Sequence, residues 1–189
     1  MTTLLHVCCA PCLSGARKAF EDENMDAVGL WFNPNIHPWK EFDLRLQTLQ
    51  RYMALEPIEV IYIEEYPLIE MISLMLQDCE KEHIAMMSPE QREKRCRVCY
   101  TERLNRTADT AIEKGFDSFS TTLLLSKYQR HELIREVGEN VSDKKGIEFM
   151  YDDMRKYWSH SLDRSRELRL YRQKYCGCIF SEQERYLDH

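Results

Sequence analysis

The alternation of short apolar runs with helical segments is the feature that most constrains how this chain folds. Five runs of strand length lie at residues 4–7, 27–32, 58–63, 117–124 and 147–151. Strands that alternate with helices favour a parallel sheet with right-handed crossovers. We therefore expect an α/β fold: one doubly wound, mainly parallel, Rossmann-like sheet with helices on both faces and a C-terminal helical segment.

Helix signals separate these runs. Ser14 is a candidate cap for the first helix, Ser88-Pro89 predicts the start of a long helix, and Gly115 predicts its end. The predicted helices cover residues 14–23, 39–55, 68–77, 89–114, 129–139 and 159–175. A chain of 189 residues suits a single domain.

Charge and hydropathy exclude some classes of protein. The formal net charge of −6 argues against a general nucleic-acid coating protein, since such proteins are usually basic. No window approaches the roughly 18 apolar residues needed to cross a bilayer, and no signal peptide precedes Cys8. We expect a cytoplasmic protein that has no membrane partner.

Unusual segments follow the predicted strands. CCAPC follows the first strand, NPNIHP the second, SKYQ the fourth, and Asp152-Asp153 the fifth. Ligands of doubly wound sheets bind at the carboxyl ends of the strands. The sequence therefore predicts one functional site at that edge.

Seven of the eight cysteines fall into three groups. The groups are Cys8, Cys9 and Cys12 in a predicted loop, Cys96 and Cys99 on one helical face, and Cys176 and Cys178 around a glycine. Without an export signal, such cysteines serve metals or redox chemistry. One zinc ion or one [4Fe–4S] cluster takes at most four thiolates, so seven indicate two metal centres, or one cluster beside reactive cysteines. Cys79 stands alone, and we interpret it as a core or surface residue.

The cysteine spacing leaves the chemistry open. It does not separate an iron–sulfur cluster from zinc, so a zinc-structured RNA-binding module without catalysis is one alternative. A thiol–disulfide oxidoreductase that uses Cys176 and Cys178 is another. A nucleotide-binding enzyme is disfavoured because neither GxxxxGK[ST] nor GxGxxG occurs.

Six motifs occur in order between His6 and Ser181. They are CCAPC, NPNIHP, RCRVCYTERL, GFDSFSTTLLLSKYQ, DDMRKYW and YRQKYCGCIFS. Together they resemble the cobalamin-independent epoxyqueuosine reductases, the QueH family. The resemblance implies the last step of queuosine synthesis, in which the epoxide of epoxyqueuosine in the tRNA anticodon loop is reduced to the alkene with release of water.

The resemblance also implies cofactors. It implies a [4Fe–4S] cluster, a neighbouring mononuclear metal (iron or zinc), and a low-potential electron donor such as ferredoxin or flavodoxin. The candidate ligands that carry over are Cys8, Cys9, Cys96, Cys99, Cys176 and Cys178. Some relatives place an aspartate at Cys12, and either side chain can ligate a metal. Residues 1–189 would form one metalloenzyme domain, whose part from about 153 to 189 closes the metal site.

The implied reaction needs a proton for the departing oxygen. The candidates for this general acid are Asp152, Asp153, Tyr157 and His160. A cluster would pass electrons singly, and an adjacent metal would act as a Lewis acid.

Three segments are candidates for substrate contacts. Asn33, Asn35 and His37 would contact the modified base or its diol, although both asparagines suit simple turns and His37 is also a possible ligand. Ser126, Tyr128 and Gln129 lie where the fourth predicted strand meets a helix. The N-terminus of that helix would hold a phosphate, or these residues would only cap it. Arg155 and Trp158 belong to a basic and aromatic segment that suits RNA, against the alternative of a solvated helical face.

Overall fold

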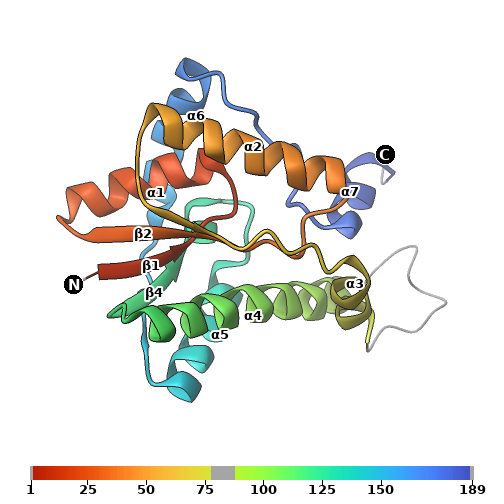
Figure 1. Ribbon diagram of the computed structural model, residues 1–189. Coiled ribbons are helices and arrows are strands. Elements are labelled where there is room, and N and C mark those ends of the chain that lie inside the picture. The colour runs from red at the N-terminus through yellow and green to blue at the C-terminus, as the bar shows by residue number, and fades with distance from the viewer. Residues whose placement is uncertain (1, 78–87, 188–189) are drawn as a thin grey trace.

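Five parallel strands form one sheet in the computed structural model, which describes residues 2–77 and 88–187 (Figure 1). The strands are β1 (Thr2–His6), β2 (Asp26–Trp31), β3 (Val60–Tyr62), β4 (Ser118–Thr121) and β5 (Glu148–Phe149). Their order is β3-β2-β1-β4-β5, and every pair is parallel. The predicted doubly wound α/β fold is confirmed. Its topological switch point lies between β1 and β4, where such sheets bind ligands.

Helices cover both faces of the sheet. Helices α1 (Ala10–Asp22) and α2 (Trp39–Leu55) lie on one face, and α6 (Trp158–Glu167) packs against α1 (Figure 1). Helices α4 (Pro89–Lys114) and α5 (His131–Lys145) lie on the other face. The central strands β1 and β4 are consequently buried, whereas the edge strand β3 is half-buried. In the described part of the chain, no helix has the length and apolar character that crossing a bilayer requires.

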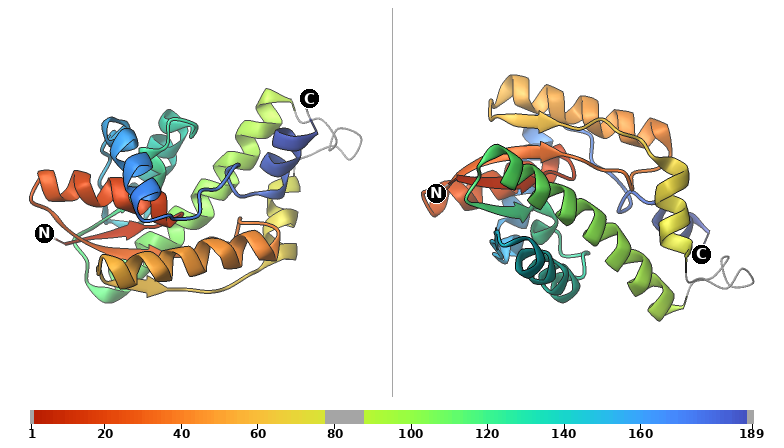
Figure 2. Two further views of the ribbon diagram at one scale, coloured as in Figure 1. Left: turned by 90° about the horizontal axis from the view of Figure 1, so that it is seen from above. Right: turned by 60° about the horizontal axis from the view of Figure 1, so that its bottom comes forward.

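Helix α4 is long enough to project beyond the carboxyl edge of the sheet (Figure 2). It starts at a capping box between Ser88 and Gln91 and ends at Gly115, whose left-handed backbone stops the helix, as predicted. Helices α3 (Leu68–Leu76) and α7 (Ile179–Tyr186) lie beside its N-terminal half. The projecting half of α4 therefore carries its cysteines to the same edge as CCAPC.

The first predicted helix begins earlier than expected. The CCAPC segment is not a loop, because α1 already starts at Ala10 and Cys9 caps it. Ser14 lies inside the helix, where its hydroxyl donates to the carbonyl of Pro11 at 2.8 Å. Sequence reasoning overlooked that a cysteine followed by alanine and proline also starts a helix.

Other boundaries differ near the carboxyl edge. The predicted strand 117–124 ends at Thr121 and continues as the 3₁₀ turn η2 (Thr122–Leu125). The fifth strand covers only Glu148–Phe149, and α5 runs from His131 to Lys145 instead of over 129–139.

The predicted helix 159–175 is wrong beyond Glu167. The 3₁₀ turn η3 (Met154–Tyr157) leads into α6, and Arg169 then adopts a left-handed φ of 49°. Residues 168–178 run without regular structure to α7. This irregular segment can cross the carboxyl edge of the sheet, which a continuous helix would not do.

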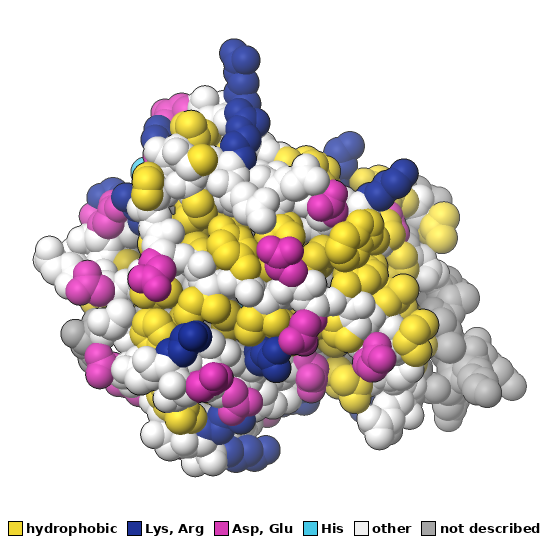
Figure 3. Space-filling view, viewed as in Figure 1, with side chains coloured by type: hydrophobic (Ala, Val, Ile, Leu, Met, Phe, Trp, Pro, Cys, Tyr) yellow, Lys and Arg dark blue, Asp and Glu magenta, His cyan; other side chains and the backbone are white. Residues whose placement is uncertain are grey.

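The face of the molecule in Figure 3 mixes acidic and basic side chains around a band of apolar ones. This band lies between α2 and α4. Charge is thus not segregated on this face. The interpretation of Cys79 lies outside the described residues.

Candidate metal centre

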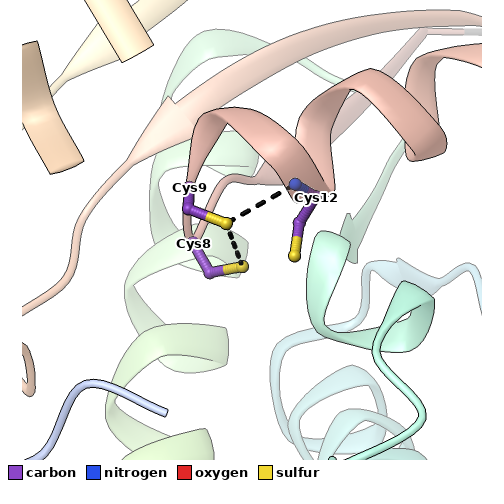
Figure 4. A group of neighbouring side chains, drawn as sticks. All are labelled: Cys8, Cys9 and Cys12. Carbon is purple, nitrogen blue, oxygen red and sulfur yellow. Dashed lines mark hydrogen bonds between the residues drawn. The ribbon is translucent and has the colours of Figure 1, made fainter. Parts of the chain in front are cut away.

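Cys8, Cys9 and Cys12 form a tight group that we call the triad (Figure 4). Their sulfurs all lie within 4.8 Å of one another, and the Sγ atoms of Cys8 and Cys9 are 3.8 Å apart. Cys8 follows β1, Cys9 caps α1 by accepting from the amide of Cys12 at 3.5 Å, and Cys12 lies in the first turn. One strand-to-helix junction thus brings three buried thiols together.

Hydrogen-bond donors surround the triad. The hydroxyl of Thr122 donates to Cys8 Sγ at 3.2 Å and accepts from the Cys8 amide at 3.0 Å, which joins the ends of β1 and β4. Gln173 donates to Cys9 Sγ at 3.0 Å. Burial opposes ionisation of Cys9, yet the contacts with Cys12 and Cys8 and the nearby Arg45 lower its pKa well below the ordinary value. Cys9 therefore favours the thiolate, the form that binds metals, whereas contacts within the triad and burial raise the pKa values of Cys8 and Cys12.

The other four described cysteines, Cys96, Cys99, Cys176 and Cys178, form a wider group, which we call the tetrad. Cys96 and Cys99 lie one turn apart on α4, and Cys178 caps α7 two residues after Cys176. Cys99 and Cys178 share one apolar cluster with Met71, Met75 and Phe180. Burial raises the pKa of Cys99, and the nearby thiols of the other three tetrad cysteines raise it further. In the described part of the chain, no three tetrad sulfurs lie within 4.8 Å of one another, whereas the three triad sulfurs do.

The turn between Cys176 and Cys178 needs its glycine. Gly177 has a φ of +133°, and a Cβ there would lie 3.1 Å from a guanidinium nitrogen of Arg45 and 3.2 Å from Ile36. Arg45 also donates to the carbonyls of Tyr175 and Cys176 at 3.2 and 3.0 Å. Helix α2 thereby fixes the C-terminal half of the tetrad.

Three buried arginines surround the thiols, and sequence reasoning missed all of them. Arg45, Arg95 and Arg103 are 2%, 4% and 1% exposed. Arg45 pairs with Glu41 at 2.7 Å, and Arg95 pairs with Glu184 at 2.9 Å.

Arg103 differs from Arg45 and Arg95 in having no carboxylate partner among the described residues. It donates to the carbonyl and Sγ of Cys99 at 3.2 and 3.0 Å, and no described carboxylate lies within 4.0 Å of it. A buried guanidinium needs an anionic partner, so thiolate at Cys99 fits this position. The spacing was a usable signal, since Arg103 follows Cys99 by four residues on one helical face.

A cavity of about 560 Å³ lies between the triad and the tetrad. Cys8 and Cys12 from the triad and Cys176 from the tetrad line it. Ser126, Tyr128, Gln129 and Trp158, all predicted substrate contacts, also line it. Gln129 donates to Cys176 Sγ at 3.3 Å and accepts from the hydroxyl of Tyr100 at 2.7 Å. The structure thus gathers these predicted residues around one cavity.

The NPNIHP segment lies elsewhere. Asn33, Asn35 and His37 are at most 1% exposed and are not among the described residues that line the cavity. Asn33 donates to the carbonyl of Val7 at 2.8 Å, and the backbone of His37 accepts from Tyr175 and donates to Gly177, both at 2.7 Å. The structure therefore places this loop behind the tetrad, where it supports the Cys176–Cys178 turn.

The four acid candidates are not brought to the cavity either. Asp153 pairs with Arg155, which lowers the pKa of that carboxyl to about 2, and both side chains are exposed. His160 lines a separate cavity of about 400 Å³ with Arg17 and Arg164. Asp152, Asp153, Arg155 and Tyr157 are absent from the described lining of the thiol-bordered cavity.

Fold and site together define a class: a doubly wound α/β protein in which two cysteine groups border one cavity near the switch point, through Cys8, Cys12 and Cys176. The profile of the family described as Epoxyqueuosine reductase QueH matches residues 3–184. The chain belongs to the QueH family of epoxyqueuosine reductases, a family of oxidoreductases.

Individual relatives agree with this assignment. A protein of Dehalococcoides mccartyi named epoxyqueuosine reductase QueH is 33% identical over 183 residues, which cover 97% of this chain and 93% of the relative. The protein of that name from Thermotoga maritima is 33% identical and covers 100% and 94%. The one from Streptococcus pyogenes is 30% identical and covers 98% and 72%.

Proposed function

We propose that this protein reduces epoxyqueuosine in tRNA to queuosine, the last step of queuosine biosynthesis. Two electrons and two protons convert the epoxide to an alkene and one water molecule. The observation that carries the proposal is the meeting of two thiol groups at one cavity, beside a buried Arg103 that no described carboxylate pairs. Neutral thiols would not offset that charge, whereas metal-bound thiolates would.

The spacing of the triad suits a single ion. Tetrahedral coordination with metal–sulfur bonds of about 2.3 Å separates two sulfurs by about 3.8 Å. The sulfurs of Cys8 and Cys9 are 3.8 Å apart. Cys8, Cys9 and Cys12 would therefore hold the mononuclear metal, iron or zinc, beside the cavity that Cys8 and Cys12 line.

The tetrad suits a larger occupant. Cys96, Cys99, Cys176 and Cys178 supply the four thiolates that a [4Fe–4S] cluster takes. Their sulfurs are more open than those of the triad, as a multi-atom cluster requires. Arg95 and Arg103 lie close enough for the tetrad thiols to affect their pKa values, so both would offset the negative charge of the cluster.

When bound, the cluster would supply single electrons and the ion would supply a Lewis acid. The chain itself holds the substrate between them. Ser126 and Gln129 would orient it, and the part from about 153 to 189 would close the site, since Gln173, Tyr175 and Cys176 from its irregular segment line the cavity. Asp152, Asp153, Tyr157 and His160 stay a prediction as proton sources. Ferredoxin or flavodoxin would deliver the electrons in the cytoplasm, where the seven cysteines that the structure describes would stay reduced.

Anaerobic purification tests the proposal, followed by absorbance, EPR, and iron, sulfide and zinc analysis of one sample. We expect about four iron and four sulfide per chain and one further metal. The same sample should then convert epoxyqueuosine tRNA when a low-potential donor is added.

Two other results would contradict the proposal. Stoichiometric zinc without sulfide, even after cluster reconstitution, would favour a zinc-structured RNA-binding module. A titratable disulfide of Cys176 and Cys178 without iron would favour a thiol–disulfide oxidoreductase. Cys79→Ser is the matched control, because Cys79 lies outside the three cysteine groups of the sequence, and its loss should leave the metal content unchanged.

A further inference from the structure

Two aromatic rings and one lysine form a corner at the rim of the thiol-bordered cavity. The ring centroids of Tyr128 and Trp158 are 5.8 Å apart, and the rings are inclined by 81°. The amine of Lys127 lies 5.3 Å from the Tyr128 centroid and 5.9 Å from that of Trp158. All three residues line the cavity. We call them the aromatic corner.

Tyr128 lies outside the core, whereas Trp158 is half-buried and packs against it. Tyr128 is 76% exposed, so burial contributes little to holding its ring there. The turn that carries it is nevertheless fixed, because the Tyr128 amide donates to Ser126 Oγ at 3.3 Å. The Tyr128 ring is thus attached to a fixed turn and remains largely exposed, so another flat ring can reach it.

The lining of the cavity is basic in an acidic protein. Five cationic side chains line it: Arg45, Lys127, Arg172, Lys174 and Arg185. None of the described lining residues is an Asp or Glu, although the chain carries a net charge of −6. This separation of charge suits an anionic occupant such as a phosphodiester strand.

The two observations together favour RNA over an acidic protein partner. Unpaired nucleobases stack on exposed aromatic rings while nearby cations hold the backbone. A concave cavity of about 560 Å³ suits a nucleoside-sized group, whereas protein partners usually bind flatter surfaces. An acidic electron-donor protein would use the cations but not the cavity.

We propose that the aromatic corner stacks an unpaired RNA base adjacent to the reacting nucleoside. The enzyme would then require a single-stranded RNA context and would use a free nucleoside poorly. This inference rests on the proposed function in taking RNA as the substrate. It adds a second nucleotide site to the cavity in which the reacting nucleoside binds.

The test measures binding of the anaerobically purified holoprotein to an unmodified stem–loop RNA of anticodon-arm sequence. The fluorescent base 2-aminopurine replaces the nucleotide beside the modified position. We expect Tyr128→Ala to weaken binding by about tenfold or more and to abolish the quenching of 2-aminopurine. Tyr128→Phe keeps the ring and should bind within about twofold of the parent protein. Lys127→Gln should lower the slope of log K against log salt by about one, whereas Tyr128→Ala should leave it unchanged.

Tyr151→Ala is the matched control. Tyr151 also carries a cation over its ring, that of Arg135 at 5.3 Å, but it is outside the described lining of the cavity. Its RNA affinity should equal that of the parent protein.

Several outcomes would overturn the inference. The first is that the parent protein does not bind RNA. The second is that Tyr128→Ala binds RNA as tightly as the parent protein. The third is that Tyr128→Phe and Tyr128→Ala lose RNA affinity to the same extent. Loss of reduced-ferredoxin binding in place of RNA binding would assign the corner to the electron donor. Failure of the proposed function would give a different result. The protein would then bind RNA in a Tyr128-dependent way but would not reduce epoxyqueuosine. That result would support the aromatic corner as an RNA site and contradict the reductase activity.

Discussion

The triad and the tetrad contain the same side chain but are built in different ways. The triad lies within five consecutive residues, and one helix N-terminus sets its geometry. The tetrad joins α4 to a turn almost 80 residues later, and Arg45, on a third element, holds that turn. A local group is formed as soon as its helix forms, whereas a distant group depends on tertiary packing and on its occupant. We expect the two groups to bind different cofactors, and we expect substitutions in them to change the metal and sulfide content in different ways.

The largest effect should follow from removing a tetrad ligand. Cys99→Ser should lose most of the sulfide and about four iron per chain, because the buried position offers no other thiolate. Activity on epoxyqueuosine tRNA should fall by more than about 100-fold. This loss is larger than the roughly 10- to 100-fold loss that typically follows substitution of a residue that hydrogen-bonds to a metal ligand. Iron and sulfide analysis with single-turnover assays checks both. Retained sulfide would show that Cys99 is not a cluster ligand.

A triad substitution should have a different signature. Cys12→Ser should lose one metal per chain and keep the sulfide, because it leaves the tetrad intact. Activity should fall by about 100-fold, because the Lewis acid that the lost ion would supply is worth several kcal/mol. Metal analysis beside Cys99→Ser is the direct comparison. If Cys12→Ser also lost its sulfide, the division into two separate centres would be wrong.

Arg103 tests the charge balance of the tetrad. Arg103→Gln removes a buried positive charge beside Cys99, so the reduction potential of the cluster should fall. We expect a fall of about 60 mV, a tenfold change in the one-electron equilibrium. A redox titration followed by EPR measures it, and Arg103→Lys should recover most of the shift. A potential that stays unchanged in both variants would remove Arg103 from the charge balance.

The sequence predicted the fold well because its signals are local. The capping box at Ser88 marks the start of α4, and the left-handed Gly115 marks its end. The positions of the strands are predicted by their apolar runs. The residues that support the site give weaker signals. Glu41 and Arg45 have the i, i+4 spacing of an ordinary surface pair, yet they are buried against Cys176. Burial of a charged pair depends on contacts across the fold, which spacing does not report.

The NPNIHP segment shows a different limit of the sequence pattern, and its substrate contacts stay a prediction. Its polar residues suggested substrate contacts, but the structure places them behind the Cys176–Cys178 turn. Polar side chains at the carboxyl edge of a sheet are common at functional sites, so the pattern indicates the right region. Whether such a side chain faces a cavity or supports a neighbouring turn depends on where the distant C-terminal segment lies.

The smallest expected effect concerns the turn that completes the tetrad. Gly177→Ala combines a left-handed φ of +133° with close approach to Arg45 and Ile36, so it should destabilise the protein by about 1–3 kcal/mol. Gly115→Ala is the control, since its φ is +75° and nothing lies within 4 Å of the added Cβ. Both variants should lower Tm, but only Gly177→Ala should speed the loss of iron during chelator challenge, by a few-fold. Equal rates of iron loss would mean that backbone strain alone matters and that the Arg45 contact does not hold the tetrad together.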